Sequence, residues 1–430
     1  MRAVWYVTCL SVAVSFPIAT VHGQTEWVHE RLARVASSPS WLNAHVSPLG
    51  VPVFTASTGT AVSVFVGSTN LSEAILGPGY HSAVARGVTE EGLPIWWDRG
   101  GRRLFVGTEE VAANVTDVAY NQRARGGHVS YVRYIDGLYK VFVGDTDVTT
   151  MALGPTGEGR LPSAPNTDGV LAWRGRGPGT DGYWDMFAGT ENLSSFLGPG
   201  RTAEGGRIDD AGHVAWIGRS PSTGDRSKVF VDRRDLTSEV FGPAGDGVTR
   251  WMNRRGDVLW EGGAMVNNII LNTSNISEPV IGRPQSLFAL RLSENGHVLW
   301  SAVRSMEEGW HLFRDDVDLT GTLGGPGFES DHAAQINASG HTLWTIWHNE
   351  TGVGGVLYDD FNLSKDALGV DVVAGSALAI GDGGHCLWWW ETGPQSYEIW
   401  LSTPVPEPGA ALALSGCLGL LALRSRRRAV

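Results

Sequence analysis

Cysteine is scarce in this chain, with three in 430 residues. Cys9 and Cys417 lie in the apolar segments at the two ends, which leaves Cys386 alone in the body of the chain. A disulfide framework needs paired cysteines, and a thiolate metal site needs several. The body of the chain therefore has neither a disulfide framework nor a cysteine-based metal site.

Basic residues are outnumbered as well. The 33 Lys and Arg residues stand against 45 Asp and Glu residues, which gives a formal net charge of -12. A protein that binds a phosphate backbone needs a basic face to displace counterions. This composition argues against nucleic acid as a partner.

Motifs of common enzyme classes are missing too. The sequence has no nucleophile elbow, no His-Glu-x-x-His and no phosphate-binding loop. What is abundant is glycine, at 57 residues, and tryptophan, at 18, while only 18% of residues are charged. Disordered chains are highly charged and poor in aromatics, so this composition indicates a folded, turn-rich protein with a large core.

The N-terminal segment has the order of a secretory signal. Arg2 precedes an apolar run over residues 3–19, and Val21-His22-Gly23 places small residues where signal peptidase needs them. We predict that residues 1–23 are a signal peptide cleaved after Gly23. The alternative is a first core strand or helix.

The C-terminal segment reads Pro406-Glu407-Pro408, then an apolar stretch over residues 409–423, then Arg424, Arg426, Arg427 and Arg428. Fifteen helical residues reach only about 22 Å, less than the roughly 30 Å of a hydrocarbon core, and the arginines orient the stretch with its end in the cytoplasm. This order resembles a PEP-CTERM sorting tail, here residues 403–430. The resemblance implies an exosortase-type protease as partner and transient membrane anchoring. A simple C-terminal membrane anchor is the alternative.

A repeat fills the chain between these segments. A glycine stands four residues before an aromatic residue nine times, and successive glycines lie 42, 35, 42, 43, 44, 40, 44 and 44 residues apart. The pairs are Gly50 and Phe54, Gly92 and Trp96, Gly127 and Tyr131, Gly169 and Trp173, Gly212 and Trp216, Gly256 and Trp260, Gly296 and Trp300, Gly340 and Trp344, and Gly384 and Trp388. A period of about 42 residues is typical of four-stranded propeller blades.

A second mark, Asn or Asp, then an aliphatic residue, then Ser or Thr, follows the first eight glycines by 19 to 23 residues. Its eight copies begin at Asn70, Asn114, Asp147, Asn192, Asp235, Asn275, Asp318 and Asn362. Asn or Asp before a glycine with positive φ closes a hairpin, and we expect the second mark to cap the next turn in the same way. Several copies match glycosylation sequons, but three carry Asp, which favours turn chemistry over glycan attachment.

These marks predict an all-β fold over residues 24–402, a β-propeller of eight or nine blades. An open β-solenoid is the alternative. The ninth unit lacks its second mark, so its missing outer strand is expected from residues 25–36, which have no other partner. Joining the two ends in one blade removes the exposed sheet edges of an open stack.

The glycine-aromatic pattern resembles the tandem repeats of exported bacterial proteins that carry PEP-CTERM tails. It resembles more faintly the Asp-box of sialidase-type propellers. The Thr of that box is absent, since Leu or Ala precedes the aromatic residue, as at Leu259 and Ala172. The second resemblance therefore implies a propeller and no enzyme.

Three groups of side chains are candidates for chemistry. His follows the anchor glycine at His128, His213, His297, His341 and His385. A ring of these imidazoles would hold a metal, whereas separate hairpin tips would leave them as solvated turn residues. Oxygen-rich loops at 315–318 and 359–362 leave Ca²⁺ open as a cofactor, although neither has EF-hand spacing. Trp97 and Trp389 are expected either to stack on sugar rings or to be core.

No catalytic residue can be assigned, because adjacent carboxylates on a strand point to opposite faces and do not form a glycosidase pair. We expect an exported envelope or matrix protein that binds exopolysaccharide or envelope proteins without catalysis. The alternative is a carbohydrate-active propeller, a glycoside hydrolase or a polysaccharide lyase.

Overall fold

The structure, a computed structural model, describes residues 26–405 except 37–42, 58–60, 80–81, 120–121, 222–223, 225, 264–267, 283–285, 304–308, 332, 373–374 and 394–395. The expected signal peptide with Gly23, and the sorting residues Pro406, Glu407, Pro408, Arg424, Arg426, Arg427 and Arg428, lie outside this part. The chain divides into two compact units, 1–27 with 404–430, and Val28–Thr403. Within the described ranges, no helix is long and apolar enough to span a membrane.

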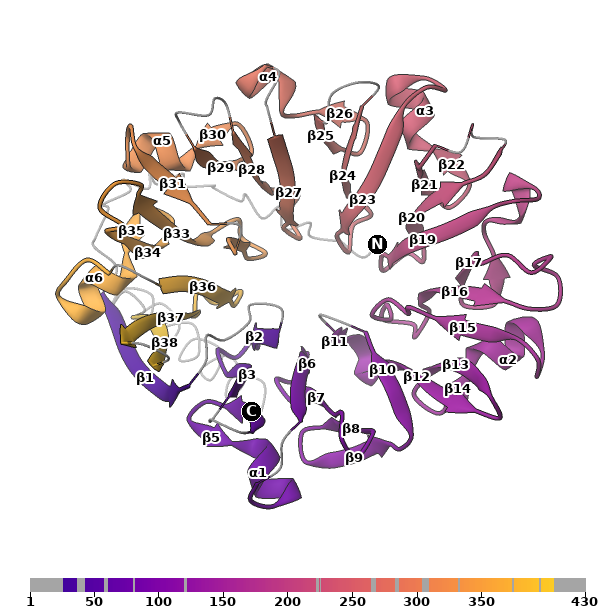
Figure 1. Ribbon diagram of the computed structural model, residues 1–430, viewed down its shortest axis with the longest axis horizontal. Helices are drawn as coiled ribbons and strands as arrows, with labels where there is room; N and C mark the ends of the chain where they lie inside the picture. The colour runs from indigo at the N-terminus through magenta and orange to yellow at the C-terminus, as the bar shows by residue number, and fades with distance from the viewer. Residues whose placement is uncertain are drawn as a thin grey trace, which may run out of the picture. The chain divides into compact units, whose positions relative to one another are not determined.

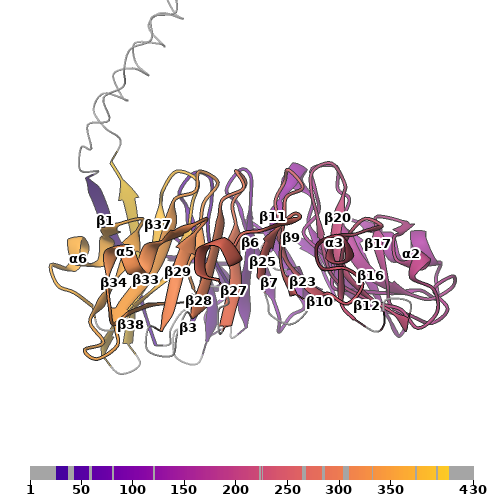
Figure 2. The same ribbon diagram turned by 90° about the horizontal axis from the view of Figure 1, so that it is seen from above.

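The larger unit is an all-β propeller of nine blades, each a sheet of four or five strands (Figure 1). This confirms the expected fold and the higher of the two blade counts, and it excludes the open solenoid. Figure 2 shows the sheets from the edge of the ring, with α2 (Val148–Leu153) and α6 (Leu363–Leu368) on the outer rim.

The first three blades include the unit that departs most from the repeat. Blade one has β2 (Ala44–Val46), β3 (Pro52–Ser57), β4 (Val62–Val66), β5 (Thr69–Asn70) and then α1 (Leu71–Leu76). Blade two has β6 (Ala83–Thr89), β7 (Pro94–Asp98), β8 (Arg103–Val106), β9 (Glu109–Ala112) and β11 (Gln122–Ala124). Blade three has β10 (Val115–Val118), η2 (Arg125–Gly127), β12 (Ser130–Ile135), β13 (Leu138–Val143), β14 (Thr146–Asp147) and α2.

The next three blades follow one plan. Blade four has β15 (Glu158–Arg160), β16 (Ala172–Arg176), β17 (Asp185–Ala188), β18 (Glu191–Asn192) and η3 (Ser195–Leu197). Blade five has β19 (Thr202–Ile208), β20 (Val214–Arg219), β21 (Lys228–Val231), β22 (Arg234–Asp235) and α3 (Leu236–Phe241). Blade six has β23 (Asp246–Met252), β24 (Val258–Gly263), β25 (Asn268–Leu271), β26 (Ser274–Asn275) and α4 (Glu278–Ile281).

The last three blades lead back to the N-terminal strand. Blade seven has β27 (Ser286–Leu292), β28 (Val298–Val303), β29 (Trp310–Arg314), β30 (Val317–Asp318) and α5 (Leu319–Leu323). Blade eight has β31 (Phe328–Ser330), β32 (Gln335–Ile336), β33 (Thr342–His348), β34 (Gly354–Tyr358), β35 (Phe361–Asn362) and α6. Blade nine has β36 (Gly375–Ile380), β37 (Cys386–Gly393), β38 (Ser396–Pro404) and β1 (Trp27–Val35).

Except in blade three, where Gly127 lies in η2 after β11, the anchor glycine lies in the turn between the innermost strand and the second strand of its blade. In blade eight, Asn337 Oδ1 accepts hydrogen bonds from the backbone N–H groups of Ser339 and His341, and Gly340 has a φ of +89°. A positive φ suits glycine, which has no Cβ to clash. The turn chemistry inferred from the sequence is therefore confirmed.

The aromatic residue of each unit lies in the core between sheets, as the alternation predicts. Trp96, Trp173, Trp216, Trp260, Trp300, Trp344 and Trp388 have no exposed surface. Five of these rings stack on an aromatic side chain of the third strand, as Trp96 does on Phe105 with ring centroids 4.1 Å apart; the other four are Trp173, Trp216, Trp300 and Trp388. The indole N–H also finds an acceptor, as Trp300 does at the carbonyl of Asp315, 2.8 Å away. Stacking and a satisfied donor explain why the position favours tryptophan.

The second mark caps the chain as expected, but in most units it caps the start of a short helix instead of a turn. In blade one, the Asn70 side chain caps α1 by accepting from the backbone N–H of Glu73. The buried Ser72 hydroxyl accepts from the backbone N–H of Val64, which lies on the third strand. In six further units the hydroxyl oxygen likewise accepts from the backbone N–H eight residues earlier, at Thr149, Ser194, Thr237, Ser277, Thr320 and Ser364.

The shortened unit is where the second mark fails. Asn114 has a φ of +58°, and the chain enters β10 directly instead of forming a helix. The following β11 pairs in parallel with β6 of the preceding blade. Blade three therefore reuses residues that other units place in the outer helix, which accounts for the spacing of 35 residues.

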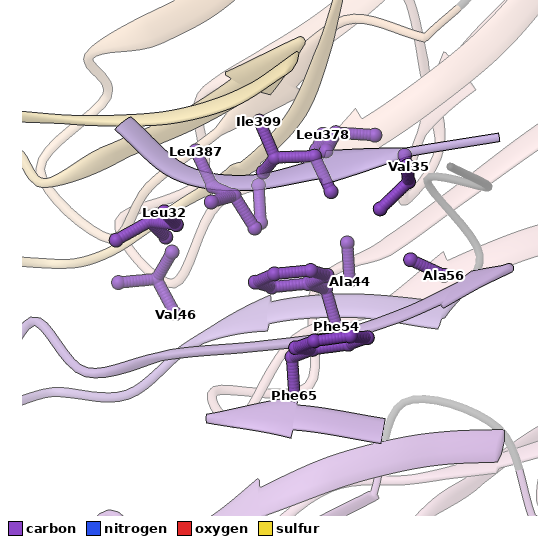
Figure 3. Packing of buried hydrophobic residues seen from close by; sticks show 11 residues of the cluster. Leu32, Val35, Ala44, Val46, Phe54, Ala56, Phe65, Leu378, Leu387 and Ile399 are labelled. Atoms are coloured by element: carbon purple, nitrogen blue, oxygen red, sulfur yellow. The ribbon is translucent and has the colours of Figure 1, made fainter. Parts of the chain in front are cut away.

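The N-terminal strand closes the ring, as the sequence predicts. β1 pairs with β38 as the outermost strand of blade nine, and Arg31 forms an ion pair with Glu398 at 2.9 Å. Figure 3 shows Leu32 and Val35 of β1 in one apolar cluster with residues of blades one and nine. The cluster contains Leu32, Val35, Ala44, Val46, Phe54, Ala56, Phe65, Leu378, Ala379, Leu387 and Ile399. The first and last blades thus share a packed interface.

Candidate functional site in the central channel

A cavity of about 240 Å³ lies where the innermost strands of the blades converge. One repeat position dominates its wall, five residues before the anchor glycine. In chain order this position holds His45, Gly87, Gln122, Ala164, Arg207, Trp251, Arg291, Gln335 and Ala379. Of these, His45, Ala164, Arg207, Trp251, Arg291, Gln335 and Ala379 line the cavity. We call this the channel position.

The backbone is irregular beside the channel position. The pairing between the innermost and second strands shifts register just before Gly87, Arg207, Trp251, Arg291 and Ala379. A β-bulge inserts an extra residue and re-aims the side chain that follows it. At the four bulged positions that line the cavity, the bulge accounts for the direction of the side chain; these are Arg207, Trp251, Arg291 and Ala379.

On blades five to eight the channel position holds arginine, tryptophan or glutamine side chains. Arg207, Trp251 and Arg291 occupy the channel position of three successive blades. The Cζ atom of Arg207 lies 5.3 Å from the centroid of the Trp251 ring, and that of Arg291 lies 4.7 Å from it. Arg291 Nε also donates to Gln335 Oε1 of blade eight at 3.1 Å. The indole thus holds two guanidinium groups near one point of the channel.

Keeping both guanidinium groups charged in the channel costs free energy. Burial within the propeller lowers the pKa of Arg207, although its side chain remains exposed to the channel. Burial, and then the positive charge of Arg207, lowers the pKa of Arg291 to about 10. Both groups are still protonated at neutral pH, so this part of the channel carries two positive charges.

The hairpin end of the channel has the opposite character. Arg254 of blade six forms ion pairs with Asp210 at 2.7 Å and with Glu90 of blade two at 3.2 Å. Its backbone N–H donates to Glu294 Oε2 at 2.8 Å. Three carboxylates therefore surround one arginine at the level of the anchor glycines.

The histidines after the anchor glycines are held by structural bonds. Nδ1 of His213, His297 and His341 lies 2.7 to 2.8 Å from Asp232, Asp315 and Asp359, respectively. His385 bonds Thr403 instead. In the part of the chain that the structure describes, no three His, Cys, Asp or Glu residues are grouped closely enough to hold a metal ion.

The other candidate groups also have structural partners. Asp318 caps α5, and Asp359 accepts from the backbone N–H of Thr342, so these loop oxygens are engaged within the fold. Trp97 is 7% exposed and belongs to a core cluster, so for Trp97 stacking on sugar rings was wrong and the core alternative holds. Trp389 is partly buried and packs edge-to-face against Tyr397. The Cys386 thiol is buried, and burial raises its pKa.

Arg207, Trp251 and Arg291 were not among the residues singled out from the sequence. A signal for them exists, because all three stand five residues before an anchor glycine. The residue one place later is apolar in most units, as at Ile208, Met252 and Leu292. Charge and size at the channel position thus vary from blade to blade, while the neighbouring position is apolar in every unit but that of Arg123.

Comparisons with known proteins add little. No protein-family description matches the sequence, and no curated protein matches it. One similar solved structure is titled "Crystal Structure of Mitotic Checkpoint Complex", at 10% identity and a TM-score of 0.28, covering 94% of this chain and 99% of that chain. A luciferin-regenerating enzyme has 8% identity and a TM-score of 0.26, covering 88% of this chain and 96% of that chain. Likenesses this distant carry no argument about function.

Proposed function

We propose that this chain is an exported, non-catalytic binding module of a bacterial cell envelope or extracellular matrix, which binds a glycan or another protein at its central channel. The observation that carries the proposal is the contrast between two positions of the repeat. The aromatic core position keeps its residue type around the ring, whereas the channel position changes from His45 through Arg207 and Trp251 to Ala379. Framework positions hold the fold, so variation at a position that lines the channel supports a binding surface there.

Export is supported by the two ends of the sequence. Residues 1–23 have the order of a signal peptide, and residues 403–430 resemble a PEP-CTERM tail. In this proposal an exosortase-type protease acts on the tail after a transient anchoring step. The protein is then released or held at the envelope, among exopolysaccharide.

The rival function is a carbohydrate-active enzyme. A glycosidase needs two carboxyl groups about 5 to 9 Å apart across the sugar ring. Among the described residues that line the 240 Å³ cavity, Glu294 is the one carboxylate, and its Oε2 already accepts from the Arg254 backbone. This arrangement favours binding over hydrolysis.

A glycan array combined with a hydrolysis and lyase screen of the purified protein tests the two functions. We expect retention of one class of glycan, or of an envelope protein in a parallel capture experiment, without turnover. Release of reducing ends or of unsaturated sugars from any polysaccharide would favour the enzyme instead.

A second experiment addresses export. A variant lacking residues 406–430 should unfold at the same temperature as the intact chain and accumulate in the medium of an exosortase-containing host. A matched variant in which Arg424, Arg426, Arg427 and Arg428 are replaced by Gln should be missorted but equally stable. Misfolding of the truncated chain would mean that the tail belongs to the propeller.

A further inference from the structure

Arg207 has an unusual position for a charged side chain. In the part of the chain that the structure describes, no carboxylate or other hydrogen-bond acceptor contacts its guanidinium, and burial is the one cause that shifts its pKa. Acidic residues outnumber basic ones by 45 to 33 in the sequence, yet among the described residues none shifts the pKa of Arg207. Because its side chain is exposed to the channel, an anion can reach it.

The neighbouring groups increase the cost of this charge. Arg291 lies close enough to Arg207 that its pKa is lowered by the second positive charge. Two like charges repel each other, and the Trp251 ring offsets only part of that repulsion through its electron-rich faces. An anion between the guanidinium groups would remove the repulsion and supply the missing acceptor.

The geometry also suits a carboxylate. A guanidinium that stacks on an aromatic ring presents its N–H edge in the plane of the group, where it can donate two parallel bonds to a carboxylate. The cavity of about 240 Å³ has the volume of about eight waters, below the roughly 300 Å³ at which drug-sized pockets begin. It therefore suits one sugar-sized group rather than a larger ligand.

We infer that Arg207, assisted by Arg291, binds the carboxylate of an acidic sugar in the channel. This inference rests on the proposed glycan-binding function and names its ligand class. Trp251 positions both guanidinium groups, and the apolar side chains of Met252 and Leu292, which also line the cavity, can cover the C–H face of the sugar.

The charges at the hairpin end give the site a direction. Glu90, Asp210 and Glu294 surround Arg254 there, and like charges repel an approaching carboxylate. The acidic sugar therefore enters from the end of the channel opposite the anchor glycines.

Calorimetric titration of the full chain with sodium D-glucuronate, D-glucose and sodium acetate tests the inference. We expect glucuronate to bind with a Kd of about 1 mM or tighter, and glucose not to bind. Acetate should bind about tenfold more weakly than glucuronate, because it has no sugar ring to contact the apolar wall. Equal binding of acetate and glucuronate would overturn the assignment to a sugar, since it indicates a bare carboxylate site.

Two variants locate the site. Arg207→Gln should weaken glucuronate binding at least about tenfold, because charge-assisted hydrogen bonds are lost. Arg207→Lys should retain part of the affinity, since it keeps the charge without the planar fork. Arg233→Gln is the matched control, because this exposed arginine pairs with Glu191 on the outer rim. Thermal unfolding confirms that each variant is folded.

The outcomes separate this inference from the function on which it rests. Absence of glucuronate binding, or equal binding by the wild type and Arg207→Gln, overturns the carboxylate site. If a neutral glycan or a protein still binds the same preparation, the proposed function stands without it. If nothing binds and a polysaccharide is cleaved, both fail.

Discussion

The imidazole of His385 lies against Gly50, so a side chain of blade nine covers the hairpin turn of blade one. A methyl group on Gly50 would come within 2.5 Å of His385 Nε2. The same relationship links His128 to Gly169 and His297 to Gly340, each in neighbouring blades. The seam where the ring closes is therefore built like the interfaces within it.

Replacing Gly50 by Ala should open this seam. The positive φ of +80° costs an L-residue about 1–2 kcal/mol, and the contact with His385 adds the cost of overpacking, about 1–3 kcal/mol. Gly212→Ala is the control, because its φ is +91° but no atom lies within 4 Å of the added methyl group. Urea unfolding should show a larger loss for Gly50→Ala. Equal losses would mean that His385 moves aside freely.

Stability should also depend on pH through His385. Burial lowers its pKa below the ordinary 6.5, so as pH falls from about 6.5 the unfolded chain takes up a proton before the folded one does. Stability from this group is therefore present above pH 6.5 and lost on acidification. The unfolding midpoints measured at about pH 5 and at about pH 8 should lie closer together in His385→Gln than in the wild type.

His213 has the opposite sign and serves as the control. Its hydrogen bond to Asp232 raises its pKa, so the stability it supplies is complete below pH 6.5 and is lost as pH rises through the raised value. His213→Gln should therefore lower stability at acidic pH more than at alkaline pH. The same direction of change in both histidine variants would contradict this account.

The repeat could be predicted from the sequence because its determinants are local. A glycine with positive φ and an aromatic residue four places later define one hairpin, and both recur with nearly constant spacing. The closing strand over residues 27–35 could be predicted because the ninth unit lacked a fourth strand. Counting strands required no knowledge of how distant residues pack.

The rest depended on contacts that the sequence does not display. From the sequence alone, Ser72 is interpreted as a turn residue. In the structure its hydroxyl oxygen accepts a hydrogen bond from the backbone N–H of Val64, eight positions earlier. Arg207 looks like an ordinary surface residue of a polar strand. Only the closed ring and the bulge before it bring the side chain into a shared channel with Trp251.

Removal of one buried hydroxyl should destabilise the whole ring. Ser364 has no exposed surface, and its Oγ accepts from the backbone N–H of Val356 at 3.0 Å. Ser364→Ala leaves that donor unsatisfied at a cost of about 1–3 kcal/mol. Ser364→Thr should be nearly neutral, because Thr237 has the same role in blade five. Thermal unfolding that ranks alanine and threonine equally would contradict the role of the hydroxyl.

Deleting residues 25–40 should destabilise both ends of the repeat together. This segment contains β1, whose His29 bonds Ser402 and whose Leu32 and Val35 are buried in the cluster shared by blades one and nine. In a closed ring each blade depends on its two neighbours, so loss of the strand exposes the edge of β38 and weakens the first blade as well. Unfolding should remain one cooperative transition at lower denaturant concentration.

Hydrogen exchange and two point variants make this test specific. Protection should fall both in the described residues of 43–57 and in residues 398–401, whereas an open stack of units would lose it at one end only. Leu32→Ala should cost about 2–5 kcal/mol, because a buried leucine is removed. Val28→Ala, at a residue that is 57% exposed on the same strand, should change stability little. Loss of protection confined to residues 43–57 would show that β1 stabilises its neighbour without closing the ring.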